Sequence, residues 1–172
     1  INWMSKYQQD ICTLTLGNCM KSLNLPASYY FIWFFFKLPI LIIVGFLIFP
    51  IIEKKLFKNS LNQILIYSIL ITTASILILF MILNVAIYDE LRHVMFLVPL
   101  IFIIALHNLY LINKKFFSYS CIFVIIFFII ENISINPYQY TWLNSFSKFY
   151  KVNKTFEVDY WGISGKNLYS SI

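Results

Sequence analysis

The sequence predicts an all-α membrane protein with about four transmembrane helices and polar extracytoplasmic ends. Three observations support this fold class. Hydrophobic residues make up 60% of the 172 residues, aromatic residues 20% and charged residues only 12%. Apolar runs approach the roughly 20 residues that a helix needs to cross a bilayer. Lysines gather in short clusters beside these runs, as is typical of loops at a membrane surface.

Charge and motifs restrict the function classes further. The formal net charge of +6 is modest and comes from those lysine clusters, so we interpret it as a topological signal and expect no nucleic-acid partner. The sequence contains no Gly-rich phosphate loop, no Ser/His/Asp order and no Cys/His zinc spacing. We therefore predict neither a cofactor nor a metal site. The chain begins without an initiator Met or a signal peptide and stops within polar sequence. We therefore expect it to be a fragment of a longer membrane protein.

Residues 1–36 are predicted to form an extracytoplasmic or interfacial segment. The first 28 residues are mixed and polar, and the aromatic run that follows suits the headgroup region of a bilayer. Cys12 and Cys19 either pair outside the membrane or stay free, and the odd number of cysteines slightly favours the free form.

A transmembrane bundle is predicted over residues 37–135. Pro39 suits the first turn of a helix, because its missing N–H costs nothing there, and it places a first span at about 37–52. The later apolar runs predict spans at about 64–87, 94–112 and 116–135. Intramembrane His107 and Asn108 are expected to hydrogen-bond to other helices rather than to serve transport.

Lysines predict the orientation of the spans. One cluster, Lys54, Lys55 and Lys58, follows the first span, and another, Lys114 and Lys115, follows the third. Both loops are therefore expected on the cytoplasmic side. The N-terminal segment, the loop between the second and third spans, and the tail of residues 136–172 then lie outside. Lysines in the tail argue mildly against this, but short loops weigh more than a long terminal segment.

The loop between the second and third spans holds a polar stretch, Tyr88-Asp89-Glu90-Leu91-Arg92-His93. On a helix, Asp89, Arg92 and His93 would share one face at spacing i, i+3 and i+4. A guanidinium offers a fixed fork of donors that matches phosphate oxygens, and histidine adds a titratable donor. Arg92 and His93 are therefore candidates for binding a lipid phosphate. Asp89 or Glu90 would orient them, bind a metal or act on a substrate hydroxyl.

Structural alternatives stand beside this interpretation. Acidic groups favour a helix N-terminus, so the polar stretch would serve only as a cap. Glu131, on the same outer half of the bundle, would then be a buried partner for Arg92. In the tail, aromatic residues beside amide and acidic groups suggest a sugar-binding surface, with Tyr138 and Trp161 as candidates. The same residue types also crowd membrane interfaces for purely physical reasons.

Several segments together resemble the GT-C superfamily of multi-spanning glycosyltransferases, in particular bacterial relatives of the protein O-mannosyltransferases and the aminoarabinose transferase. The resemblance covers most of residues 15–165, and the order and spacing of its motifs carry it. Its first part is a helix entry, Leu25-Pro26-Ala27-Ser28-Tyr29-Tyr30 with Trp33 and Lys37-Leu38-Pro39. Its second part is the polar stretch with Phe96 and Pro99. Its last part is Asn136-Pro137-Tyr138-Gln139-Tyr140 and Asp159-Tyr160-Trp161-Gly162.

This resemblance implies a polytopic enzyme in the bacterial cytoplasmic membrane that transfers a sugar from a polyprenyl-phosphate donor to an unknown extracytoplasmic acceptor. The family's catalytic acidic residue lies in a first extracytoplasmic loop with no counterpart here. We therefore expect no catalytic residue in this chain and no activity from it alone. Arg92, with His93, would contact the donor phosphate, and Lys37 would be a second cation. The alternative is a non-catalytic membrane transport or polymerase component whose polar loop is structural.

Overall fold

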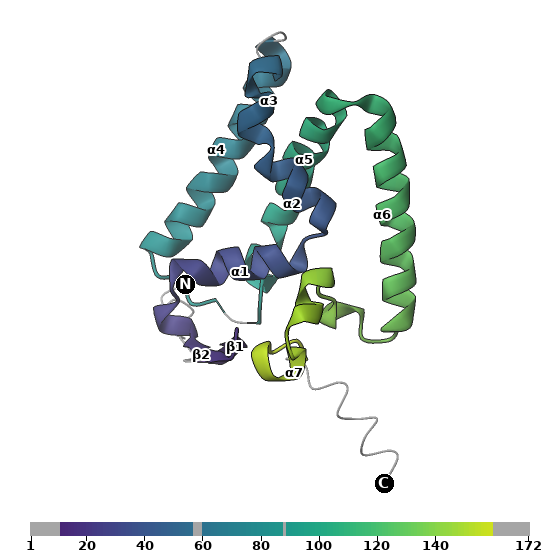
Figure 1. The fold of residues 1–172 in the computed structure, drawn as a ribbon. Helices are drawn as coiled ribbons and strands as arrows, with labels where there is room; N and C mark the ends of the chain where they lie inside the picture. Colours follow the sequence, from purple (N-terminus) through teal and green to yellow (C-terminus); the bar gives the residue numbers. More distant parts are fainter. Residues whose placement is uncertain (1–10, 57–59, 88, 160–172) are drawn as a thin grey trace. The chain divides into compact units, whose positions relative to one another are not determined.

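The computed structural model describes residues 11–56, 60–87 and 89–159 (Figure 1). It is mostly helical, as the sequence predicts, and divides into two compact units. Within the described residues, unit 1 comprises 11–37, 84–93 and 131–159, and unit 2 comprises 38–83 and 94–130. The N-terminal segment and the tail, far apart in sequence, therefore fold into one unit.

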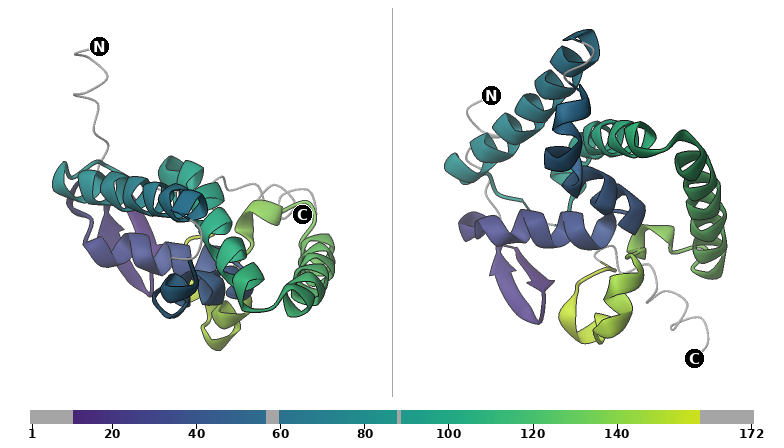
Figure 2. Two further views of the ribbon diagram at one scale, coloured as in Figure 1. Left: turned by 90° about the horizontal axis from the view of Figure 1, so that it is seen from above. Right: turned by 45° about the horizontal axis from the view of Figure 1, so that its top comes forward.

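Unit 1 begins with a hairpin of β1 (Cys12–Thr15) and β2 (Asn18–Lys21), a small departure from the all-α prediction. The connecting Leu16 and Gly17 have φ of 51° and 81°. Positive φ at both central residues is what a tight type I′ hairpin turn requires. Figures 1 and 2 show the hairpin beside α1 (Ala27–Lys37), which follows the short 3-10 helix η2 (Ser22–Asn24).

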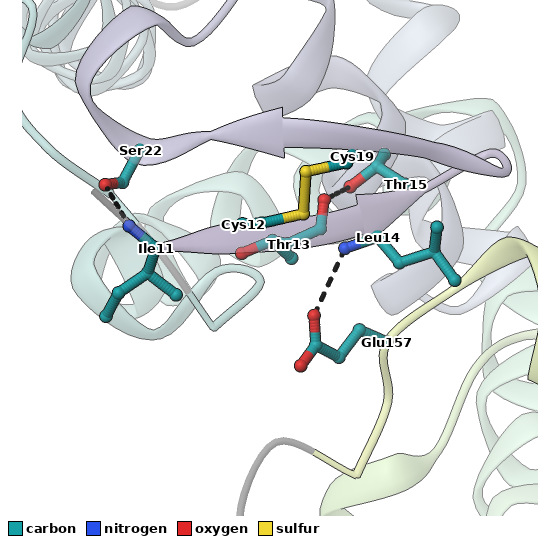
Figure 3. Close-up of a disulfide and its surroundings, with 8 residues drawn as sticks. All are labelled: Ile11, Cys12, Thr13, Leu14, Thr15, Cys19, Ser22 and Glu157. Carbon is teal, nitrogen blue, oxygen red and sulfur yellow. Dashed lines mark hydrogen bonds between the residues drawn. A yellow bond between two sulfur atoms is a disulfide. The ribbon is translucent and has the colours of Figure 1, made fainter. Parts of the chain in front are cut away.

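A disulfide between Cys12 and Cys19 joins the two strands (Figure 3). The slight preference for free cysteines drawn from the sequence is therefore wrong. The strand register sets Cys12 opposite Lys21 and Leu14 opposite Cys19, so the two cysteines lie diagonally across the hairpin, with their Cα atoms 5.4 Å apart. This separation lies within the range that a disulfide needs, and an odd cysteine count says nothing about it.

Residues of the tail hydrogen-bond to the backbone of the hairpin. The backbone N–H of Gly17 donates to the carbonyl of Thr155 at 2.9 Å, and that of Glu157 donates to the carbonyl of Leu14 at 3.0 Å. The N–H of Leu14 in turn donates to the Glu157 carboxylate at 3.2 Å (Figure 3). Strand edges left without such partners are exposed to unwanted pairing, so this contact closes one side of the hairpin.

The aromatic run forms α1, whose side chains fill the core of unit 1. Trp33 is fully buried; its indole N–H donates to the Thr15 hydroxyl at 3.1 Å, and its ring meets Phe156 edge-on at 5.6 Å. A buried indole needs such a partner for its N–H. With 11 residues, α1 is much shorter than a membrane span.

Unit 2 contains the apolar helices, together with α6, whose last turn belongs to unit 1. Their bounds are α2 (Ile40–Leu47), α3 (Phe49–Leu56), α4 (Ser60–Ile82), α5 (Val98–Ile112) and α6 (Lys114–Ser134). The 3-10 helix η3 (Arg92–Leu97) leads into α5. Among the described residues, three segments are long and apolar enough to cross a membrane: Gln63–Ile82, Arg92–Ile112 and Lys114–Ser134. They coincide largely with the second, third and fourth predicted spans.

The region of the first predicted span, 37–52, holds two short helices, α2 and α3, rather than one. Proline explains the break. Pro50 has no N–H to donate, and its ring would clash with the carbonyl of Phe46 if the helix were continuous. The second span also differs from its prediction, because α4 ends at Ile82 and not at 87. Asn84 has φ of 45°, a left-handed conformation that asparagine tolerates and that commonly ends a helix.

A close helix contact holds α2 against α5 inside unit 2 (Figure 2). A Cβ at Gly45 would lie 2.7 Å from the carbonyl oxygen of Ala105 and 2.9 Å from Cγ of Leu109. The buried amide of Asn108 donates to the Gly45 carbonyl at 3.0 Å. Small residues that let backbones approach and amides that bond across helices are typical of membrane bundles. The prediction is confirmed for Asn108 but not for His107, whose buried Nε2 has no hydrogen-bond partner among the described residues.

Candidate functional site

The polar stretch is a backbone reversal rather than the first turn of a helix. Asp89 and Glu90 have φ of 55° and 63°, and η3 begins only at Arg92. The N–H of Arg92 donates to the Asp89 carbonyl at 3.3 Å. A left-handed conformation is costly for a long side chain such as Glu90, so surrounding contacts must stabilise it.

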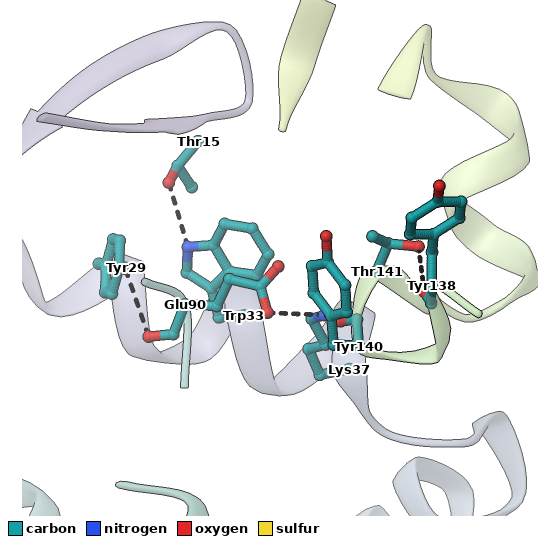
Figure 4. A network of polar contacts seen from close by, with 8 residues as sticks. All are labelled: Thr15, Tyr29, Trp33, Lys37, Glu90, Tyr138, Tyr140 and Thr141. Carbon is teal, nitrogen blue, oxygen red and sulfur yellow. Dashed lines mark hydrogen bonds and ion pairs between the residues drawn. The ribbon is translucent and has the colours of Figure 1, made fainter. Parts of the chain in front are cut away.

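The strongest of these contacts is a buried ion pair (Figure 4). The Lys37 ammonium lies 2.6 Å from Oε2 of Glu90, and the two side chains are only 15% and 7% exposed. Lys37 also donates to the Tyr140 carbonyl at 2.9 Å, and Tyr29 donates its hydroxyl to the Glu90 carbonyl at 3.3 Å. The group therefore joins α1, the polar stretch and the tail.

Burial raises the pKa of Glu90 to about 7, although the Lys37 charge opposes the shift. Oε1 of Glu90 is buried without a hydrogen-bond partner among the described residues. A carboxylate in such surroundings is costly to keep ionised. Burial likewise raises the pKa of Tyr29, which therefore stays a hydroxyl donor across the physiological range.

Arg92 and Asp89 are the predicted phosphate-site residues that the structure brings together. Nη1 of Arg92 lies 3.4 Å from Oδ2 of Asp89, with side chains 47% and 20% exposed. His93 is half-buried at the next position. Lys37, predicted as a second cation, has its ammonium on Glu90 and Tyr140 instead; its role in phosphate binding stays a prediction.

The predicted tail residues are placed only in part. Tyr138 is half-buried just before the 3-10 helix η4 (Gln139–Thr141), and its carbonyl accepts from the Thr141 hydroxyl at 2.7 Å. Trp161 lies outside the described residues. The tail continues through η5 (Ser145–Phe149) and α7 (Val152–Thr155).

Glu131, considered above as a partner for Arg92, has other partners in the structure. Its Oε2 accepts from the indole N–H of Trp142 at 3.0 Å, and its Oε1 lies 3.4 Å from the Lys148 ammonium. These side chains line a small hollow in unit 1. The sequence shows an acidic residue at the end of an apolar run and a nearby Trp. Their spacing, however, did not predict that the two side chains meet.

The described residues contain no group of three His, Cys, Asp or Glu side chains that could hold a metal ion. Comparisons with family models, curated proteins and solved structures found no match to this chain.

Proposed function

We propose that this chain is the C-terminal part of an integral-membrane glycosyltransferase of a bacterial cytoplasmic membrane, which moves a sugar from a polyprenyl-phosphate donor to an extracytoplasmic acceptor. The observation that carries the proposal is the half-exposed Arg92 side chain at the first residue of the candidate span Arg92–Ile112. A lipid phosphate lies at this level of a bilayer. The planar, permanently charged guanidinium matches its oxygens.

The neighbours of Arg92 support this role. Asp89, at 3.4 Å, is close enough to orient the guanidinium, but an ion pair this long and this exposed is weak. A phosphate that accepts two charge-assisted hydrogen bonds can therefore compete with Asp89 for the guanidinium N–H groups of Arg92. His93 follows directly at the same end of the span and is half-buried.

The proposed topology has four crossings, with α2 and α3 together forming the first. Lysine clusters orient unit 1 towards the extracytoplasmic side. The Cys12–Cys19 disulfide supports the same orientation independently, because disulfides persist in oxidising compartments and are rare in the cytosol.

Substitution of Arg92 in the full-length protein tests the proposal. We expect Arg92→Ala to lower sugar transfer from a polyprenyl-phosphate donor at least ten-fold, since one charge-assisted hydrogen bond is worth about 1.5–3 kcal/mol. Arg92→Lys should restore part of the rate. Lys151→Ala, an exposed cation of the same unit, is the control. Normal transfer by folded, membrane-inserted Arg92→Ala protein would refute the phosphate role.

A second candidate is a non-catalytic membrane transport or polymerase component. The buried ion pair of Lys37 and Glu90 favours it, since these charges are used to hold unit 1 together. For such a component, every substitution in the polar stretch should act only by destabilising the folded protein. Parallel measurement of transfer and thermal unfolding in the Arg92 variants separates the two candidates.

A further inference from the structure

The proposed phosphate contact leaves unused a hollow at the C-terminal end of α6. Its volume of about 280 Å³ lies just below the roughly 300–1,000 Å³ of sites for drug-sized ligands, so it has room for about one sugar ring. Its polar and aromatic lining comes from the last turn of α6 and from the tail: Glu131, Ser134, Thr141, Trp142, Ser147 and Lys148.

Apart from the Lys148 ammonium, the Ser134, Thr141 and Glu131 side chains of this lining offer hydrogen-bond acceptors. The Ser134 hydroxyl already donates to the Glu131 carbonyl, and the Thr141 hydroxyl to the Tyr138 carbonyl, both at 2.7 Å. Each hydroxyl has one hydrogen, so what these oxygens still offer is lone pairs. The Glu131 carboxylate is also an acceptor. Together with the Lys148 ammonium, which donates, these acceptors match a sugar hydroxyl, which donates and accepts at once, better than a phosphate, whose charge the Glu131 carboxylate repels.

The Glu131 carboxylate is held on one side and accessible on the other. Trp142 fixes Oε2 through its indole N–H at 3.0 Å. Oε1 faces the Lys148 ammonium at 3.4 Å, and the Lys148 side chain is 71% exposed. Because the Lys148 side chain is largely exposed and the contact is long, this pair contributes little to stability and opens easily. A hydroxyl group can enter between the two, because it donates to a carboxylate and accepts from an ammonium at once.

We propose that this hollow binds a neutral saccharide, with sugar hydroxyls on Glu131, Lys148 and the Ser134 and Thr141 oxygens. The half-buried Trp142 ring contributes an apolar surface beside the anchored carboxylate. The role of this subsite, for donor or acceptor sugar, rests on the proposed function. Binding itself requires no transfer and can be measured alone.

The experiment uses the full-length protein in phosphatidylcholine nanodiscs, free of sugar-based detergent. The probes are methyl glycosides of common hexoses, N-acetylhexosamines and pentoses, and binding is measured by saturation-transfer NMR and titration calorimetry. We expect saturable binding of at least one glycoside. Glu131→Gln and Trp142→Phe should each weaken it at least ten-fold, while thermal unfolding confirms that the variants fold.

Thr141→Val provides a gentler variant, because it removes an acceptor without touching the carboxylate, and it should weaken binding about three- to ten-fold. Arg92→Ala should leave glycoside binding unchanged, whatever it does to transfer. The inference is overturned if no glycoside binds, if Glu131→Gln and Trp142→Phe bind as well as wild type, or if inorganic phosphate or ethanolamine displaces the glycoside. If Arg92→Ala loses transfer and no glycoside binds to the wild-type protein, this subsite is refuted and the proposed function still stands.

Discussion

The Lys37 ammonium and the Glu90 carboxylate lie 2.6 Å apart within unit 1, on segments separated in sequence by more than one apolar helix. Both side chains are mostly withdrawn from water, and Lys37 reaches the Tyr140 carbonyl as well. Removing one partner of such a pair leaves an uncompensated buried charge, which is more damaging than removing both. The stability of unit 1 should therefore depend on this contact.

Lys37→Met tests the pair directly. At pH 8 we expect it to destabilise the protein by about 3–5 kcal/mol, because the Glu90 carboxylate is left buried without a counter-charge. At pH 5 the loss should be much smaller, since Glu90 can take up a proton. Thermal unfolding at both pH values measures the difference. Lys151→Met, an exposed control, should change little at either pH, and an equal loss at pH 5 and pH 8 would contradict a role for ionised Glu90.

The raised pKa of Glu90 predicts a stability that depends on pH. Because burial raises this pKa from 4.5 to about 7 in the folded protein, the folded state binds the proton more tightly than the unfolded state. The contribution is therefore fully present below pH 4.5 and is lost as pH rises through about 7. Glu90→Gln should flatten the slope between pH 5 and pH 7 in unfolding experiments. A protonated-carboxyl infrared band that titrates near pH 7 in wild type should be missing from the variant.

Gly45→Ala should loosen α2 from α5. The new methyl group would meet the Ala105 carbonyl at 2.7 Å, a backbone atom that cannot turn aside. Overpacking of this kind costs about 1–3 kcal/mol. Val44→Ala, at a position 43% exposed, is the matched control and should be nearly neutral. Unchanged unfolding of Gly45→Ala would mean that the two helices are farther apart than described.

The disulfide predicts a labelling pattern and a stability change. Denatured, unreduced protein should react with maleimide only at Cys121, and all 3 cysteines should react after reduction. Replacing Cys12 and Cys19 together by serine should cost unit 1 about 2 kcal/mol, the loop-closure value for a short loop. Full labelling of protein taken from an extracytoplasmic surface without reductant would count against both the bond and the proposed orientation.

The sequence predicted those parts of the fold that follow from local composition. Long apolar runs are visible in any short window, so the three candidate spans were found to within a few residues at most ends. The exceptions depended on single residues. Pro50 divides the first predicted span, and Asn84 ends α4 early, although the apolar run continues to Ile87. Ile87 is apolar because it is buried in unit 1, not because it faces lipid.

The candidate site was predicted less completely, because its contacts are not local. Nothing in the spacing of Lys37 and Glu90 indicates that they meet, and the tail residues that complete the group come from a third segment. Arg92 and Asp89 could be paired from sequence, since they are three residues apart. Glu131 could not be assigned correctly, because its partners depend on how the tail folds back after α6.

The hydrogen bond from Gly17 to Thr155 gives synthesis a fixed order of events. The hairpin is made before the apolar helices, and its edge partner is made after them. At about 5–20 residues per second, roughly ten seconds pass between them. During that time the apolar helices between the two segments must be inserted into the bilayer. Unit 1 therefore closes only after every intervening helix has been synthesised.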